Sequence, residues 1–190
     1  FSCEGCQTEL KKESLTAHTL IGECDKMFEM GETASLSDTL LPIGSILRAD
    51  ADAFIDSIKT VKNKMLIKGD MNVCIVYCAD SEDGKVEKFT HTMPLSQIAE
   101  LQGIDEESIC DVKIHISSLT VSPKTDINGE NRLVDITVKS VAEVSCYSEK
   151  EYITAEDCYC IDYEATCEYK NIDFQKRVCT YKDTKQLRSS

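Results

Sequence analysis

The stretch Met65-Leu66-Ile67-Lys68-Gly69-Asp70-Met71-Asn72-Val73-Cys74-Ile75-Val76-Tyr77-Cys78-Ala79 decides the fold of this chain. Its second half is apolar at consecutive positions. The odd positions are Val73, Ile75 and Tyr77, and the even positions are Cys74, Val76 and Cys78. A half-exposed strand alternates apolar and polar residues, whereas a strand covered on both faces is apolar throughout. The pattern therefore predicts a core strand covered on both faces.

Other segments alternate as half-buried strands do. Val112, Ile114 and Ile116 are separated by polar residues, and a short run from Leu15 to Ile21 also alternates. A longer run places its apolar residues on one parity: Val134, Ile136, Val138, Ala142 and Val144. Strands at roughly ten-residue spacing with turns between them are typical of an antiparallel sheet protein.

Turn residues and helix signals complete the predicted fold. Asp83-Gly84 and Asn128-Gly129 predict hairpins, because both residue types tolerate positive φ. We expect one or two short helices, near residues 50–59 and 94–101, the second with Pro94 in the first helical position. The predicted class is mainly β: an antiparallel sandwich or barrel-like sheet with terminal strands available for pairing between subunits or repeats.

The length of 190 residues suits one domain with added strands. We divide the chain into a cysteine-containing leader or connector at 1–14, a β domain at 15–156, and a C-terminal strand and tail at 157–190. The tail is either the start of a further repeat or a connector between subunits. Because the sequence starts at Phe1 without a signal peptide, we interpret it as processed or as a fragment.

Charge and hydropathy exclude several classes of partner. Acidic residues outnumber basic ones by 34 to 21, for a net charge of −13, and no cluster of Lys and Arg could follow a nucleic acid backbone. No apolar run approaches the roughly 18 residues that a membrane span needs. We expect no nucleic acid partner, no membrane span and no cofactor.

Cysteine is the compositional outlier, with 11 residues. Cys74 and Cys146 lie in apolar strand patterns, where a thiol behaves as a small buried hydrophobe. Six other cysteines lie in polar end segments, where burial within one subunit is difficult. We therefore predict that they form disulfides between subunits. These candidates are Cys3, Cys6, Cys158, Cys160, Cys167 and Cys179.

The C-terminal segment predicts a long amphipathic strand that is suited to assembly. Its odd positions are Tyr159, Ile161, Tyr163, Ala165, Cys167 and Tyr169, and its even positions are mostly polar. An unpaired terminal strand either closes the local sheet or adds to the sheet of the next subunit. Repeated head-to-tail addition propagates instead of closing, and so gives a fibre.

The sequence supports a metal site or an enzymatic activity less well than it supports assembly. Cys3 and Cys6 have zinc-knuckle spacing and could combine with Cys158 and Cys160 in a zinc site, although the second pair is unusually spaced. The acidic segments 80–84 and 126–130 lack the later glutamate of a calcium loop and predict plain turns. His18, His91 and His115 are far apart in the sequence, and no nucleophile elbow or phosphate loop is present. We expect no enzymatic activity.

Several segments together resemble the SPOCS (spore-coat-associated) domain family of endospore-forming bacteria. They are Leu41-Pro42-Ile43-Gly44-Ser45-Ile46-Leu47-Arg48-Ala49-Asp50, Lys64 to Gly69, Val73 to Cys78, Met93 to Ile98, Leu101 to Asp105, Val121 to Asp126 and Asp157 to Glu164. The resemblance covers roughly residues 8 to 170 and rests on the order of the pieces, none of which is a catalytic fingerprint.

The resemblance implies a structural protein of the spore envelope, in the coat, exosporium or a surface appendage. This chain departs from the family pattern at Asp157-Cys158-Tyr159-Cys160-Ile161, where the family usually has Asp-Ala-Tyr-Ser-Thr. The added thiols suggest a module that joins covalently to copies of itself or to neighbouring envelope proteins. The alternatives are an adaptor that docks other coat or cell-wall components through its tyrosine-rich tail, and a zinc-stabilised binding module.

Overall fold

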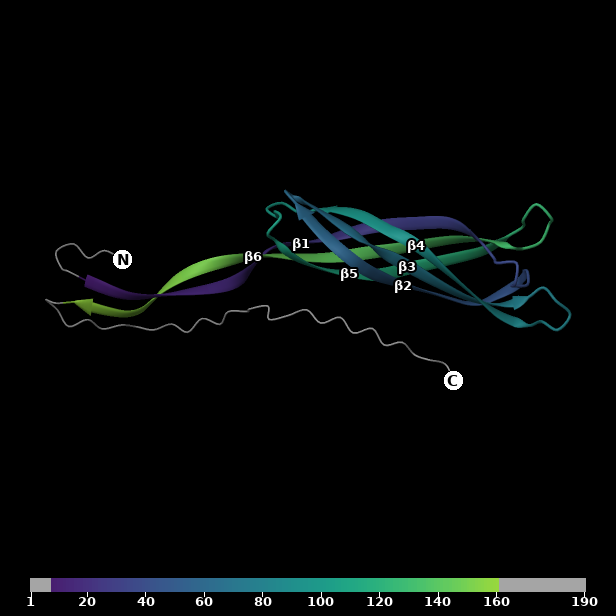
Figure 1. The fold of residues 1–190 in the computed structure, drawn as a ribbon, viewed down its shortest axis with the longest axis horizontal. Helices are drawn as coiled ribbons and strands as arrows, with labels where there is room; N and C mark the ends of the chain where they lie inside the picture. Colours follow the sequence, from purple (N-terminus) through teal and green to yellow (C-terminus); the bar gives the residue numbers. More distant parts are fainter. Residues whose placement is uncertain (1–7, 161–190) are drawn as a thin grey trace. The chain divides into compact units, whose positions relative to one another are not determined.

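The computed structural model describes residues 8–160, and all of its regular elements are strands. These are β1 (Thr8–Ser35), β2 (Ile43–Val61), β3 (Lys64–Ala79), β4 (Val86–Glu100), β5 (Ile109–Lys124) and β6 (Leu133–Cys160). They form two antiparallel three-stranded sheets with the orders β1-β6-β5 and β2-β3-β4 (Figure 1). The predicted mainly β, two-sheet architecture is confirmed, and the sheets do not close into a barrel.

The described residues divide into two compact units, 21–146 and 8–20 with 147–160. The first unit is the sandwich, with the core between its two sheets. β3 contributes its odd-numbered side chains to this core, including Met71, Val73, Ile75 and Tyr77, each at most 1% exposed. Each such side chain contributes roughly 1.5–3 kcal/mol to stability when it is fully buried.

The facing sheet supplies the even-numbered positions of β6. Val134, Ile136, Val138, Ala142 and Val144 are at most 2% exposed, as their shared parity predicts. Tyr77 is the largest of the fully buried side chains, and its hydroxyl donates a hydrogen bond to the carbonyl oxygen of Leu41 at 2.8 Å. The one polar atom of that side chain is therefore satisfied within the core.

β3 is the central strand of its sheet, but the prediction that both of its faces are covered is wrong. Its even positions, including Leu66, Cys74, Val76 and Cys78, are only half-buried. The other sheet packs against one face of β3, and no described element covers the other face. An apolar pattern on both parities therefore does not by itself ensure that both faces are covered.

The hairpin predictions are confirmed. Gly84 lies between β3 and β4 with φ of 57°, and Gly129 lies between β5 and β6 with φ of 83°. A third turn, which no sequence pattern predicted, lies between β2 and β3, where Asn63 takes φ of 60°. Asparagine is among the few residues with a side chain that tolerate this conformation.

Both predicted helices are wrong, because residues 50–59 lie in β2 and residues 94–101 lie mostly in β4. In β2 the half-buried Ala51 and Ala53 alternate with the exposed Asp52 and Phe54, which is a strand period. Pro94 is tolerated because β4 is an edge strand. The carbonyl of Lys85 and the N–H of Leu101 form hydrogen bonds on the β3 side of β4. Backbone groups of successive strand residues point to opposite sides, and the register between β3 and β4 is unbroken. The nitrogen of Pro94, at an even position, therefore points toward the free edge.

In the second unit the described residues are 8–20 of β1 and 147–160 of β6, which pair as a two-stranded ribbon. The predicted strand from Leu15 to Ile21 is part of β1 and is confirmed. Across the part of the chain that the structure describes, no helix is long and apolar enough to cross a membrane.

Candidate functional site

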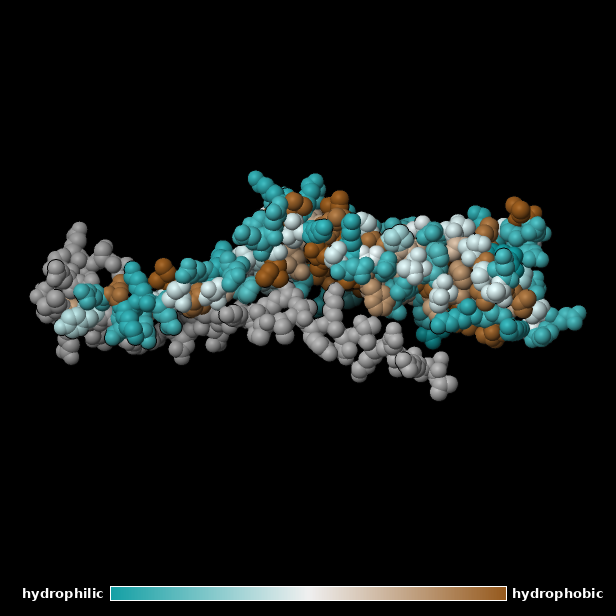
Figure 2. Space-filling model, in the orientation of Figure 1, coloured by the Kyte–Doolittle hydropathy of each residue, from teal (hydrophilic) through white to brown (hydrophobic). Residues whose placement is uncertain are grey.

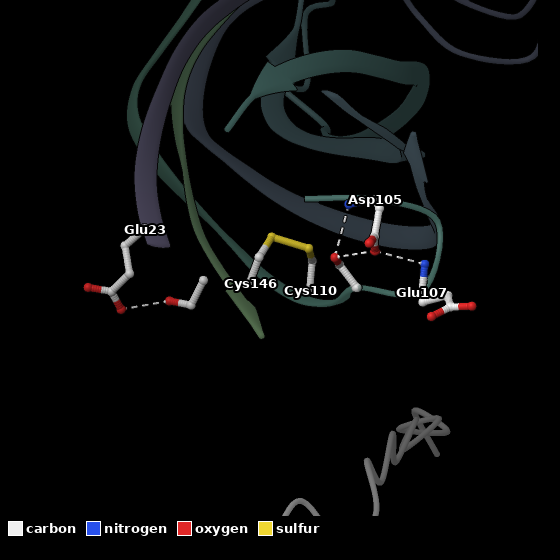
Figure 3. Close-up of a disulfide and its surroundings, with 7 residues drawn as sticks. Glu23, Asp105, Glu107, Cys110 and Cys146 are labelled. Atoms are coloured by element: carbon white, nitrogen blue, oxygen red, sulfur yellow. Dashed lines mark hydrogen bonds between the residues drawn. A yellow bond between two sulfur atoms is a disulfide. The ribbon is translucent and has the colours of Figure 1, made fainter. Parts of the chain in front are cut away.

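The thiols are the first candidates, and the structure bonds two of them. Cys110 at the start of β5 and Cys146 on β6 form a disulfide, with Cα atoms 4.1 Å apart and a sequence separation of 36 (Figure 3). The prediction that Cys146 acts only as a small buried hydrophobe is therefore wrong. The bond joins neighbouring strands of one sheet inside the sandwich unit.

Four other described cysteines are free thiols: Cys24, Cys74, Cys78 and Cys160, all half-buried. Cys74 was predicted to be a buried hydrophobe but is half-buried, on the face of β3 that no other described element covers. Cys160 ends β6, after Tyr159, whose side chain is 64% exposed.

Most of the predicted assembly residues lie outside the described residues. These are Cys3, Cys6, Ile161, Tyr163, Ala165, Cys167, Tyr169 and Cys179, and for Cys158 only the backbone is described. The assembly strand and the zinc alternative therefore remain predictions.

Polar contacts connect the two strands of the ribbon. Lys11 Nζ lies 2.6 Å from Glu156 Oε2, and the hydrogen bond to that carboxylate raises the pKa of Lys11. Thr19 and the Tyr152 hydroxyl lie 2.7 Å apart, and Ser14 donates a hydrogen bond to Glu151. Exposed pairs of this kind contribute little to stability, so they fix the pairing of the strands more than the stability of the ribbon.

The ribbon also exposes apolar surface. Ile153 is 71% exposed, Tyr159 64% and Leu20 47%. A two-stranded ribbon leaves one row of backbone N–H and C=O groups unpaired on each outer edge, and such an edge can accept a further strand. Among the described residues of this unit, only β1 and β6 contribute strands. Its edges and its exposed apolar side chains therefore fit strand addition.

The outer face of the β1-β6-β5 sheet is polar. Lys139 lies 3.5 Å from Glu29, and His115 lies 3.2 Å from Glu143. Thr33 donates a hydrogen bond to Asp135 at 2.5 Å, and this bond holds the pKa of Asp135 below its ordinary value. His115 is thus an exposed member of a polar face, as its place in an alternating strand predicts.

The outer face of the β2-β3-β4 sheet is different, and the sequence analysis missed it as a surface. Cross-strand register places Val86 opposite Cys78 and Ile98 opposite Leu66. Val86 and Ile98 are 58% and 55% exposed. Figure 2 shows apolar side chains that interrupt the hydrophilic surface of the molecule. The sequence signal that could have located this face was the run of apolar residues on the second parity of β3.

An open groove of about 540 Å³ lies on the sandwich unit beside Cys24, between the start of β3 and the end of β4. Lys26, Lys64, Ile98 and Glu100 are among its lining residues. Burial raises the pKa of the Cys24 thiol, and the neighbouring Asp25 carboxylate adds to the effect. A raised pKa lowers the fraction of reactive thiolate at neutral pH, so this thiol is suited to packing more than to chemistry.

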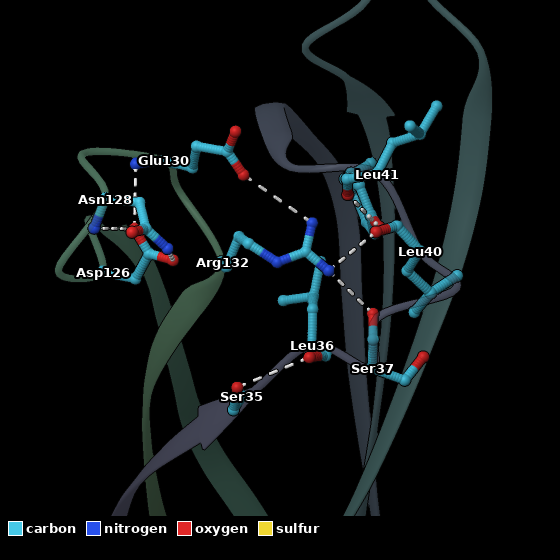
Figure 4. A network of polar contacts seen from close by, with 10 residues as sticks. Ser35, Leu36, Ser37, Leu40, Leu41, Asp126, Asn128, Glu130 and Arg132 are labelled. Atoms are coloured by element: carbon cyan, nitrogen blue, oxygen red, sulfur yellow. Dashed lines mark hydrogen bonds and ion pairs between the residues drawn. The ribbon is translucent and has the colours of Figure 1, made fainter.

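The turn at 126–130 is organised by a carboxylate that accepts backbone hydrogen bonds. Asp126 Oδ1 accepts them from the N–H groups of Asn128 and Glu130 at 2.8 and 3.0 Å (Figure 4). The bond from Glu130, with that from Asn128, holds the pKa of Asp126 below its ordinary value. The carboxylate thus serves the hairpin turn that Asn128-Gly129 predicts.

Arg132, at the end of this turn, connects it to the β1–β2 loop. Its guanidinium donates hydrogen bonds to the carbonyl oxygens of Ser37 at 2.9 Å and Leu40 at 3.1 Å (Figure 4). Its backbone carbonyl accepts a bond from the N–H of Leu36. The sequence analysis did not identify this residue.

The remaining histidines do not lie together. His91 Nε2 is buried 3.3 Å from a carboxylate oxygen of Glu32, without hydrogen-bond geometry, and its ring stacks on Phe89. His18 lies in the ribbon unit. Among residues 8–160, no three His, Cys, Asp or Glu side chains are grouped as a metal site would require.

These features define a class of protein, a disulfide-containing antiparallel β sandwich whose strands continue into a two-stranded ribbon. Residues 42–124 match the family model described as SipL, SPOCS domain. This segment is therefore similar to a SPOCS domain, the family that the sequence motifs resemble, and the similarity suggests a spore-associated protein. No match was found among curated proteins or solved structures.

Proposed function

We propose that this chain is a structural, non-catalytic protein of the spore envelope that assembles with copies of itself by strand addition and is locked by disulfides between subunits. The two-stranded ribbon is the observation that supports the proposal. Its outer edges have no third strand among the described residues of its unit, and it exposes Ile153 and Tyr159.

The physical reason is that an isolated two-stranded ribbon is marginally stable in water. Adding a strand to one edge pairs backbone groups, each bond contributing about 0.5–1.5 kcal/mol net, and covers apolar side chains. The free thiol of Cys160 lies at the end of β6, where a disulfide to the next subunit would hold an added strand in place. Because such a contact joins two different surfaces, it propagates into a fibre.

Size-exclusion chromatography of the full chain, with and without reductant, tests covalent assembly. We expect large species that reductant dissociates, and electron microscopy should show filaments. The variant that replaces both Cys158 and Cys160 by serine should lose the reductant-sensitive species. Cys24→Ser, which removes a free thiol of the sandwich unit, should keep them. A wild type that is monomeric in both buffers would contradict the proposal.

A charge on the ribbon tests strand addition separately. Ile153→Lys places a cation on an exposed apolar position of β6, and we expect it to reduce assembly at least tenfold in buffer without reductant. Met27→Lys is the matched control, since Met27 is 78% exposed on β1 within the sandwich unit. Equal assembly of the two variants, measured by light scattering, would exclude the ribbon as the contact.

A second candidate function is an adaptor that docks other coat or cell-wall components. The exposed aromatic ring of Tyr159 favours it, because tyrosine is enriched at binding hot spots. An adaptor would remain monomeric with and without reductant, and Tyr159→Ser would reduce its binding to isolated coat material. The chromatography above therefore separates the two functions.

A further inference from the structure

The turn between β5 and β6 contains the one asparagine of the chain that a glycine follows, in the pair Asn128-Gly129. Both residues are exposed. Glycine has no side chain to keep its backbone nitrogen away from the preceding residue, so an asparagine before glycine is especially prone to deamidation. The assembly proposed above gives this pair no role.

Deamidation of this pair needs water and no oxidant. The backbone nitrogen of Gly129 gives up its proton and attacks Cγ of Asn128. The new N–C bond closes a cyclic imide, and Nδ2 leaves with the proton as ammonia. Water then opens the ring at either carbonyl carbon, which gives aspartate or isoaspartate. In isoaspartate the main chain runs through the former side chain.

In the folded chain the attacking nitrogen is engaged. The N–H of Gly129 donates a hydrogen bond to the backbone carbonyl oxygen of Asp126 at 3.1 Å. As in amide hydrogen exchange, this bond must open before the nitrogen can lose its proton. The closed turn therefore slows the first step of the reaction.

The side chain of Asn128 is held by the same aspartate. Nδ2 of Asn128 donates a hydrogen bond to Asp126 Oδ2 at 3.4 Å, and the N–H of Asn128 donates to Oδ1 at 2.8 Å (Figure 4). The carboxylate holds the side-chain amide toward residue 126. The amide must be released before Cγ can rotate to meet the nitrogen of Gly129.

Charge acts in the same direction. The N–H of Glu130 donates a further hydrogen bond to Asp126 Oδ1 at 3.0 Å, and this bond, with those from Asn128, holds the pKa of Asp126 below its ordinary value. The carboxylate therefore stays ionised at neutral and alkaline pH. A negative charge beside the turn disfavours the negatively charged nitrogen that the attack requires.

We propose that Asn128 is a deamidation site that Asp126 protects, so that the reaction proceeds only when the β5–β6 turn opens. Isoaspartate would insert an extra main-chain carbon into this turn. Arg132, which ends the turn, would then lose its fixed position against the carbonyls of the β1–β2 loop. The reaction thus marks chains whose turn has opened, and it weakens the connection between the two loops.

Trypsin isolates the site for measurement. Cleavage after Lys124 and Arg132 releases the peptide 125–132, which contains Asn128 and also Asn131, an asparagine followed by a bulky residue. The full chain is incubated in mildly alkaline buffer, and mass spectrometry of this peptide follows conversion at each asparagine. A sample digested at the start corrects for conversion during digestion.

We expect Asn128 to convert at least tenfold more slowly in the folded chain than in a synthetic peptide 125–132, because the turn must open first. Asn131 should convert more slowly than Asn128 in that peptide. Equal rates for Asn128 in the chain and the peptide would overturn the proposed protection. A peptide in which Asn128 does not convert would show that the pair is no deamidation site.

A matched pair of variants tests Asp126. Asp126→Ala removes the acceptor of the bonds from Asn128 and Glu130, and it should speed conversion of Asn128 at least fivefold. Glu130→Ala removes a carboxylate of the same turn that lies 3.9 Å from Arg132, and it should change the rate less than twofold. Equal rates in Asp126→Ala and the wild type would overturn the role of Asp126.

Circular dichroism checks that the variants fold. If Asp126→Ala does not fold, Asp126→Asn takes its place, because it keeps an acceptor oxygen and loses only the charge. Asp126→Asn should also convert faster at residue 128 than the wild type. A rate no higher than that of the wild type would show that the charge of Asp126 gives no protection.

Discussion

At the residue scale, one glycine sets how closely β2 and β3 approach. A Cβ added to Gly69 would lie 1.9 Å from the carbonyl oxygen of Phe54 and 2.9 Å from the Cα of Ile55. Both neighbours are backbone atoms, beside a register shift between Ile55 and Ser57 in β2. A side chain at this position therefore requires the strands to separate.

We expect Gly69→Ala to lower the free energy of unfolding by about 1–3 kcal/mol, the usual effect of overpacking a well-packed site. Gly31→Ala is the control, since its added Cβ would meet atoms no closer than 3.7 Å, an ordinary contact. Urea unfolding monitored by circular dichroism measures both. If the two variants unfold at the same urea concentration, β2 and β3 do not approach each other at Gly69 as closely as the structure indicates.

At the element scale, side chains near strand ends connect segments that are far apart in the sequence. Arg132 links the end of the β5–β6 turn to the β1–β2 connection through two carbonyl groups. The Cys110–Cys146 disulfide links β5 to β6 within the sandwich unit. Both fix connections between segments far apart in the sequence.

Arg132→Met should cost about 1–3 kcal/mol, because the carbonyls of Ser37 and Leu40 would lose charged donors. Arg48→Met should cost much less, because Arg48 forms an exposed ion pair with Asp50. Hydrogen exchange should also be faster at the amide of Leu36 in Arg132→Met alone. Equal unfolding midpoints for the two variants would show that the loop contacts do not contribute.

Replacing both Cys110 and Cys146 by alanine should lower stability by about 4 kcal/mol in the chain-entropy model for a loop of 36 residues. Cys24→Ala, which removes a half-buried free thiol, is the control and should cost much less. Urea unfolding of both proteins under non-reducing conditions gives the difference. A double variant as stable as the control would mean that the bond does not form in solution.

At the scale of the whole molecule, net charge opposes assembly. Copies with a charge of −13 repel one another, and salt screens that repulsion with a Debye length of about 10 Å at 0.1 M. We expect assembly, followed by light scattering, to be several-fold faster at 0.15 M than at 0.01 M salt. Slower assembly at higher salt would instead indicate that ion pairs between copies drive the contact.

Much of the fold could be predicted from local patterns. The parity of β6 from Val134 to Val144 and the turns at Gly84 and Gly129 are local properties, and the structure confirms them. The two helix predictions failed because Pro94 fits both a helix start and an edge strand, and only neighbouring strands decide between them.

The sequence by itself determined the strand character, the buried parity of the strands, and the resemblance of residues 42–124 to a SPOCS domain, because each depends on residues close together in the chain or on their order. The tertiary structure alone decided that Cys146 meets Cys110 and that, among residues 8–160, no element covers the second face of β3. Those outcomes depend on which distant segments the chain path brings together, and the alternation of residues along a single strand carries no information about that path.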